Sequence, residues 1–129
     1  MSFELQCLAW TLVLALVQIF AAAGARTVEY GVKWDLGARD SEPRPLGPVA
    51  ARLLRAQANL FETLPLFVAA VLLVSVAQRT GPLTYWGALI YLIARVVYVP
   101  LYAAGVAVLR TLVWLISLVG LLMLIVAAL

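Results

Sequence analysis

The stretch TLVWLISLVGLLMLIVAAL, residues Thr111 to Leu129, contains no charged side chain. A helix of roughly 20 such residues crosses the ~30 Å hydrocarbon core of a bilayer. Three more apolar stretches lie upstream, at Cys7–Ala25, Leu60–Ala77 and Leu83–Ala104. Because backbone groups in lipid need partners inside their own segment, each stretch is predicted to form a transmembrane helix. We therefore expect an all-α integral membrane protein, one four-transmembrane-helix bundle over residues 1–129. Its predicted helices are about 3–26, 48–78, 82–105 and 109–129, with a polar cytoplasmic loop at 27–47.

The composition excludes several classes of protein. Hydrophobic residues make up 66% of the chain and charged residues 12%, whereas soluble domains are about half apolar and about a quarter charged. A soluble enzyme and a disordered chain are therefore excluded. Cys7 is the only cysteine and there is no histidine, so we expect neither a disulfide framework nor a metal cofactor. The net charge of +3 bears on membrane topology, and no nucleic-acid partner is expected.

Lysine and arginine residues are unevenly distributed among the three connections between these helices. The first connection is rich in them, the third holds Arg110, and the second holds only Arg79. Because positive residues stay on the cytoplasmic side, the first and third connections are predicted to face the cytoplasm and both termini the opposite side. The membrane would be a bacterial inner membrane or the endoplasmic reticulum. The basic residues of the first connection are Arg26, Lys33, Arg39 and Arg44.

The first apolar stretch has two interpretations. Its end, Ala21–Ala25, resembles a signal-peptidase site, which would make the stretch a cleaved signal peptide. The residues before it include Glu4 but no lysine or arginine, and the stretch is long for a signal peptide. We therefore expect a retained helix.

Polar side chains interrupt the second and third apolar segments. Arg55, Asn59 and Glu62 have the spacing i, i+4, i+7, so they share one helix face. The third segment carries a similar row of polar side chains on one face. The predicted topology puts the rows of both segments in the cytoplasmic half of the bundle, at the depth of Arg26 and Arg110. Because ionisable groups in lipid are costly, this convergence predicts one polar cavity open to the cytoplasm. The row on the third segment consists of Tyr91, Arg95, Tyr98 and Tyr102.

These residues also have purely structural interpretations. Arg110 can extend to lipid headgroups, and Tyr98 and Tyr102 can be interfacial aromatics. A buried ion pair between Arg55 and Glu62 can simply be structural and fix helix register. We interpret the tryptophans as packing or interface residues, namely Trp10, Trp34, Trp86 and Trp114.

The stretch RAQANLFE, Arg55–Glu62, followed by Pro65, resembles the second-helix signature of the MAPEG family. These are the membrane-associated proteins of eicosanoid and glutathione metabolism. Arg110–Thr111 resembles the pair that opens the family's fourth helix. The resemblance covers essentially the whole chain and is to bacterial-type or microsomal glutathione transferase-like members. The third helix resembles the family at Arg95, Tyr98 and Tyr102.

This resemblance implies a homotrimer of four-helix bundles, with glutathione as thiol co-substrate between neighbouring subunits. Arg110 and Tyr98 would be the catalytic residues, because a guanidinium beside the sulfur favours the thiolate. The thiolate would attack a lipophilic small-molecule substrate dissolved in the membrane lipid. The residues that would hold glutathione are Arg26, Arg55, Gln57, Asn59, Glu62, Arg95, Tyr98 and Tyr102.

The chain also departs from the family pattern. Thr63 stands where some transferases have tyrosine, and Val97 leaves fewer polar groups beside Tyr98 than eicosanoid synthases have, so an eicosanoid substrate is not expected. Three functions stay open: a glutathione-dependent transferase or peroxidase, a non-catalytic bundle that binds lipid or a partner protein, and a small multidrug-type transporter. A proton-coupled carrier needs a glutamate that is free to titrate, whereas Arg55, two turns away on the same helix face, is expected to hold Glu62 ionised.

Overall fold

The computed structural model describes residues 1–40 and 44–129. Within those residues the chain is helical and contains no strand. Four of the helices are long and apolar enough to cross a membrane, which confirms the predicted all-α fold with four spans. The helices are α1 (Phe3–Tyr30), α2 (Val32–Leu36), α3 (Pro48–Val76), α4 (Pro82–Ala103) and α5 (Ala107–Ala128).

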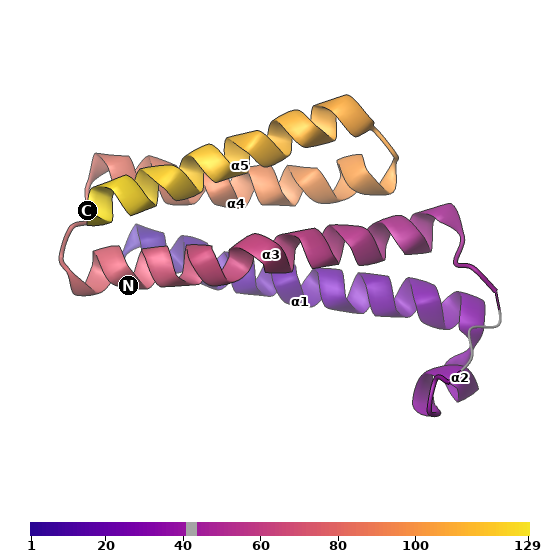
Figure 1. Ribbon diagram of the computed structural model, residues 1–129. Helices are drawn as coiled ribbons and strands as arrows, with labels where there is room; N and C mark the ends of the chain where they lie inside the picture. The colour runs from indigo at the N-terminus through magenta and orange to yellow at the C-terminus, as the bar shows by residue number, and fades with distance from the viewer. Residues whose placement is uncertain (41–43) are drawn as a thin grey trace.

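The four long helices lie alongside one another and alternate in direction (Figure 1). Both termini and the α3–α4 turn lie at one end, and α2 and the other two connections lie at the opposite end. Helix α4 packs most extensively on α5, and α1 packs on α3, whereas α1 and α5 do not touch. The second and third helices in the membrane, α3 and α4, therefore form the centre of the bundle.

The first connection differs from its predicted form. Helix α1 continues four residues beyond Arg26 to Tyr30 and is followed by the capping residue Gly31, whose φ of +92° is a backbone conformation that favours glycine. The short helix α2 follows at once, inside the segment predicted to be loop. Residues 41–43 of that segment lie outside the described residues. Helices α3 and α4 begin at Pro48 and Pro82, as the missing N–H of proline allows at a first helical position.

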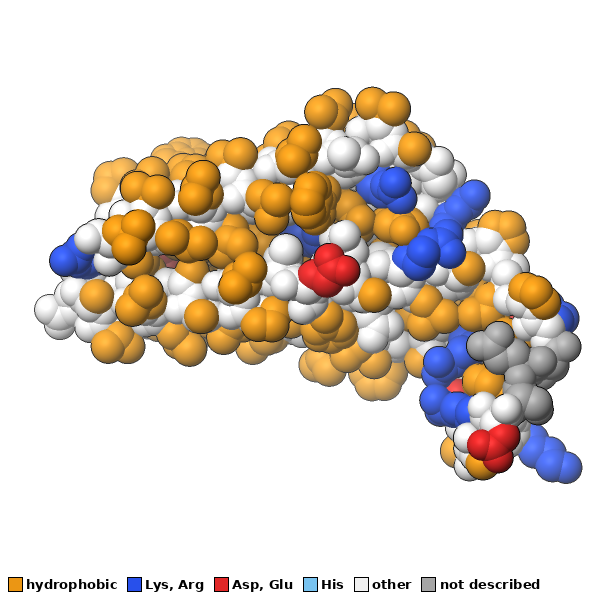
Figure 2. All heavy atoms as spheres, in the orientation of Figure 1, with side chains coloured by type: hydrophobic (Ala, Val, Ile, Leu, Met, Phe, Trp, Pro, Cys, Tyr) orange, Lys and Arg blue, Asp and Glu red, His pale blue; other side chains and the backbone are white. Residues whose placement is uncertain are grey.

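The buried core is mainly apolar, with a few polar side chains among the hydrophobic ones. Phe67 of α3 stacks on Tyr91 of α4 with ring centroids 4.0 Å apart, and the Tyr91 hydroxyl lies 2.8 Å from that of Thr63. Outward-facing apolar side chains such as Phe20 and Leu122 are more than half exposed, at 72% and 58%. Figure 2 shows hydrophobic side chains over most of the visible face of the long helices, with most basic side chains gathered toward the α2 end. An apolar exterior of this kind suits contact with lipid.

One polar contact ties α1 to α4 at the end that holds the termini. Glu4 is buried, and its carboxylate accepts a hydrogen bond of 2.9 Å from the Thr84 hydroxyl. The same hydroxyl accepts the Gly81 N–H at 2.8 Å, at the start of α4. Among the described residues, Thr84 supplies the one side-chain hydrogen bond that the Glu4 carboxylate accepts.

Replacing Thr84 with valine should destabilise the protein by roughly 1–3 kcal/mol, because a buried acceptor loses its hydrogen-bond donor. The free energy of unfolding in detergent measures the loss. Ser75→Ala is the matched control, since the Ser75 hydroxyl donates to the Val71 carbonyl within its own helix. Equal stability of the two variants would show that the Glu4–Thr84 contact contributes nothing.

Candidate functional site

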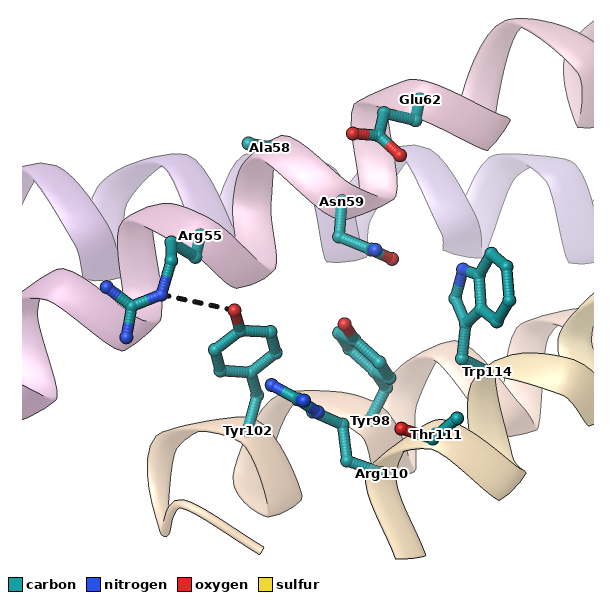
Figure 3. A pocket seen from close by; sticks show the side chains of 9 residues that line it. All are labelled: Arg55, Ala58, Asn59, Glu62, Tyr98, Tyr102, Arg110, Thr111 and Trp114. Carbon is teal, nitrogen blue, oxygen red and sulfur yellow. Dashed lines mark hydrogen bonds between the residues drawn. The ribbon is translucent and has the colours of Figure 1, made fainter. Parts of the chain in front are cut away.

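A polar cavity of about 500 Å³ opens among α3, α4 and α5 (Figure 3). It lies toward the end of the bundle where α3 begins and α4 ends. Polar and aromatic side chains from all three helices face it. The lining residues are Arg55, Ala58, Asn59, Glu62, Tyr98, Tyr102, Arg110, Thr111 and Trp114.

Helix α3 supplies one wall of the cavity from a single face. Arg55, Asn59 and Glu62 all line it, as their helical spacing predicts. Figure 3 shows Asn59 extending from α3 into the space toward Tyr98 and Trp114. The wall therefore carries a cation, an amide and a carboxylate in sequence along about two helical turns.

Two arginines from different helices meet at the ring of Tyr102. Arg55 donates from Nε to the Tyr102 hydroxyl at 3.2 Å, and its Cζ lies 5.8 Å from the ring centroid. Arg110, in the first turn of α5, places its Cζ 4.4 Å from the same centroid. Tyr98 packs edge-on against Tyr102, with centroids 5.5 Å apart. Cation–π contacts of this kind hold positive charge at the aromatic side of the cavity.

Arg95 lies behind the cavity wall. Its side chain is 1% exposed and does not line the cavity. It donates from Nη1 to Asn59 Oδ1 at 2.8 Å, and its Cζ lies 4.3 Å from the centroid of the Tyr98 ring. Arg95 therefore contacts two lining residues without facing the cavity.

Comparison with protein-family models matches residues 7–129 of this chain to the MAPEG family. The chain belongs to the MAPEG family. The match covers essentially the whole chain and confirms the resemblance read from the second, third and fourth helices. A search of curated proteins finds no match. With its four apolar helices, membership makes the chain an integral multi-pass membrane protein of a family that generally uses glutathione.

The cavity brings together six of the predicted site residues of this MAPEG protein, and three lie outside its lining. Arg26 is near the end of α1, where it donates to Asp35 Oδ1 at 3.4 Å and lies 5.7 Å from the Trp34 ring centroid. Gln57 is on α3 outside the lining, and Arg95 is behind it. Within a single chain, these three side chains therefore do not line the cavity in which a ligand would bind.

The anticipated ion pair between Arg55 and Glu62 does not form. Both residues are exposed, and the ion pairs among the described residues all involve the first connection. Seven residues along a helix separate side chains by about 10 Å, too far for a direct pair when both point outward. Arg55 and Glu62 therefore do not form the register-fixing ion pair, and family membership disfavours a multidrug-type carrier.

Trp114 is a lining residue that the sequence interpretation missed. It was assigned to packing, but it faces the cavity from α5, and its buried Nε1 has no hydrogen-bond partner among the described residues. Its spacing of i+4 from Arg110 puts both on one helix face, which was an available signal. The Thr111 hydroxyl donates to the Ala107 carbonyl at 3.1 Å and so presents an acceptor.

Proposed function

We propose that this MAPEG protein is a membrane-embedded glutathione-dependent transferase or peroxidase acting on lipophilic electrophiles. The observation that carries the proposal is the convergence of Arg55 and Arg110 on Tyr102 at one polar cavity within a membrane bundle. Two guanidinium groups that contact the same tyrosine ring suit an anionic ligand with more than one negative group.

The cavity suits glutathione in size and in chemistry. Its volume of about 500 Å³ lies within the range of about 300–1,000 Å³ that is usual for small-molecule sites. Glutathione carries two carboxylates, one ammonium group and one thiol. Arg55 offers a planar fork to a carboxylate, and Glu62 offers an anion to the ammonium group. One carboxylate and the ammonium group of the tripeptide thus have complementary partners in the lining.

Arg110 is the residue proposed to stabilise the thiolate. A guanidinium close to sulfur favours the charged form of a thiol, and the thiolate is the nucleophile. Tyr98, proposed as the second catalytic residue, lies in the same aromatic wall. Helices α4 and α5 also border an apolar groove of about 300 Å³, a route by which an apolar electrophile in lipid can approach.

We further propose that the site is completed by neighbouring copies in a homotrimer. Arg55 and Glu62 are exposed at the membrane depth of the bundle, and exposure of such charges to lipid is costly. A second copy covering this face would remove that cost, and Gln57 and Arg26 would then be available to a neighbour's cavity. The positive connections indicate that this end faces the cytoplasm of a bacterial cell or the cytoplasmic side of the endoplasmic reticulum.

Glutathione binding to the detergent-purified protein, measured by calorimetry, tests the proposal. The wild type should bind saturably, and Arg55→Ala should weaken binding roughly 10–100-fold, the usual worth of a hydrogen bond to a charged group. Arg79→Ala is the matched control, because Arg79 lies at the opposite end and donates to the Ala128 carbonyl at 3.4 Å. Absence of binding at millimolar glutathione, or binding unaffected by Arg55→Ala, would contradict the proposal.

A further inference from the structure

Arg95 is poorly satisfied where it lies. Its Nε and Nη2 atoms are buried and have no hydrogen-bond partner in the described part of the chain. None of the ion pairs found there includes it. Buried donors without partners, and a buried cation without a counterion, both cost stability. Stabilisation of the fold therefore does not account for an arginine at this position.

Within the described residues, the Arg95 side chain makes one hydrogen bond, and this bond has a chemical consequence for Asn59. A guanidinium can only donate, so the Asn59 atom that faces Arg95 must be its carbonyl oxygen. The Nδ2 group of the same amide is then left to the cavity that Asn59 lines. The amide orientation, which is often ambiguous, is fixed here by the nature of the partner.

The same guanidinium also supports the opposite wall. Its Cζ lies 4.3 Å from the centroid of the Tyr98 ring, and Tyr98 is only 3% exposed. One buried cation therefore holds a lining residue of α3 and a lining residue of α4 in a defined relation. Loss of its side chain would free both of them.

We propose that Arg95 is a positioning residue that fixes Asn59 as a hydrogen-bond donor to the cavity. The wall at Asn59 then selects a carboxylate or carbonyl oxygen of the ligand and rejects a donor. That the ligand is glutathione rests on the proposed function, whereas the orientation of Asn59 does not. The two claims are therefore separable by experiment.

Asn59 provides its own probe, because it is the only asparagine in the chain. Labelling with ¹⁵N-asparagine gives a single side-chain amide signal in the NMR spectrum of the detergent-solubilised protein. The wild type should show two well-separated amide protons, and Arg95→Met should shift them toward the values of free asparagine. Arg79→Met is the matched control and should leave them in place. An unchanged Asn59 signal in Arg95→Met overturns the proposal.

A second variant guards against misfolding of the first. Arg95→Gln keeps a polar group whose amide can both donate and accept, so it no longer imposes one orientation on Asn59. Its Asn59 signal should broaden or split, and a signal identical to wild type counts against the proposal. Thermal unfolding separates this role from a structural one: Arg95→Met should be at least as stable as wild type, because apolar replacement of a poorly paired buried charge is often neutral or stabilising.

Glutathione affinity then tests the same link by a double-mutant cycle. Arg95→Met and Asn59→Ala should each weaken glutathione binding about tenfold, which is the loss in affinity expected when one hydrogen bond to the ligand is removed. The double variant should fall clearly short of the product of the two single effects, because part of the effect of Arg95 passes through Asn59 and part through Tyr98. If the losses in affinity of the two single variants instead multiply, so that the double variant binds about a hundredfold more weakly than wild type, the proposal is overturned. If the wild type does not bind glutathione, the proposed function fails, and the NMR experiment still decides the role of Arg95.

Discussion

Replacing Arg110 with alanine should abolish the thiolate of bound glutathione and leave the oligomer intact. Arg110 lines the cavity with its guanidinium against the Tyr102 ring. It stands in the first turn of α5, where a cation opposes the helix dipole. Its removal should therefore not destabilise the helix. The expected effect is a loss of thiolate formation and of catalytic rate. Removing one group that stabilises developing negative charge typically lowers kcat by roughly 10²–10³-fold.

The ultraviolet absorbance of the thiolate, followed by stopped flow after mixing with glutathione, measures this effect directly. Arg79→Ala removes an arginine from the far end of the bundle and should keep the wild-type signal. Size-exclusion chromatography of Arg110→Ala checks that the assembly survives. A thiolate signal in Arg110→Ala equal to that of wild type would remove Arg110 from its assigned role.

The sequence predicted the spans and one wall of the cavity for clear physical reasons. Predominantly apolar stretches of this length have one stable form in lipid, so the four long helices follow from hydropathy alone. Polar residues are rare in such helices, so the spacing of Arg55, Asn59 and Glu62 stands out and defines a face. All three line the cavity.

The remaining features of the site depend on which face each helix turns toward its neighbours. In a soluble helix the apolar stripe marks the inner face, but in lipid both faces are apolar and the marker is lost. Trp114 faces the cavity, and its i+4 spacing from Arg110 was the signal that set it apart from the other tryptophans. Arg95 shares a helix face with Tyr98, yet it is buried behind the wall that Tyr98 lines. Helix α2, with only five residues, is too short for a periodic signal.

The close approach of α4 and α5 makes Gly120 the most sensitive packing position. A Cβ atom at Gly120 would lie 2.6 Å from the Gly87 carbonyl oxygen and 2.8 Å from the Tyr91 backbone nitrogen. Both are backbone atoms, so the helices themselves would have to separate. Gly120→Ala should therefore destabilise the protein by roughly 1–3 kcal/mol, the usual cost of overpacking. Because Tyr91 is on the helix that carries Arg95 and Tyr98, the displacement should also disturb the cavity.

Unfolding in detergent and glutathione affinity measured on the same samples test both parts of this expectation. Gly24→Ala is the matched control, because a Cβ at Gly24 in α1 meets no atom within 4 Å. In a helix interior alanine is favoured over glycine by about 1 kcal/mol, so this variant should be at least as stable as wild type. Equal stability of Gly120→Ala and Gly24→Ala would mean that α4 and α5 do not approach at Gly120. A destabilised Gly120→Ala with unchanged affinity would instead confine the strain to the apolar half of the bundle, away from the polar cavity.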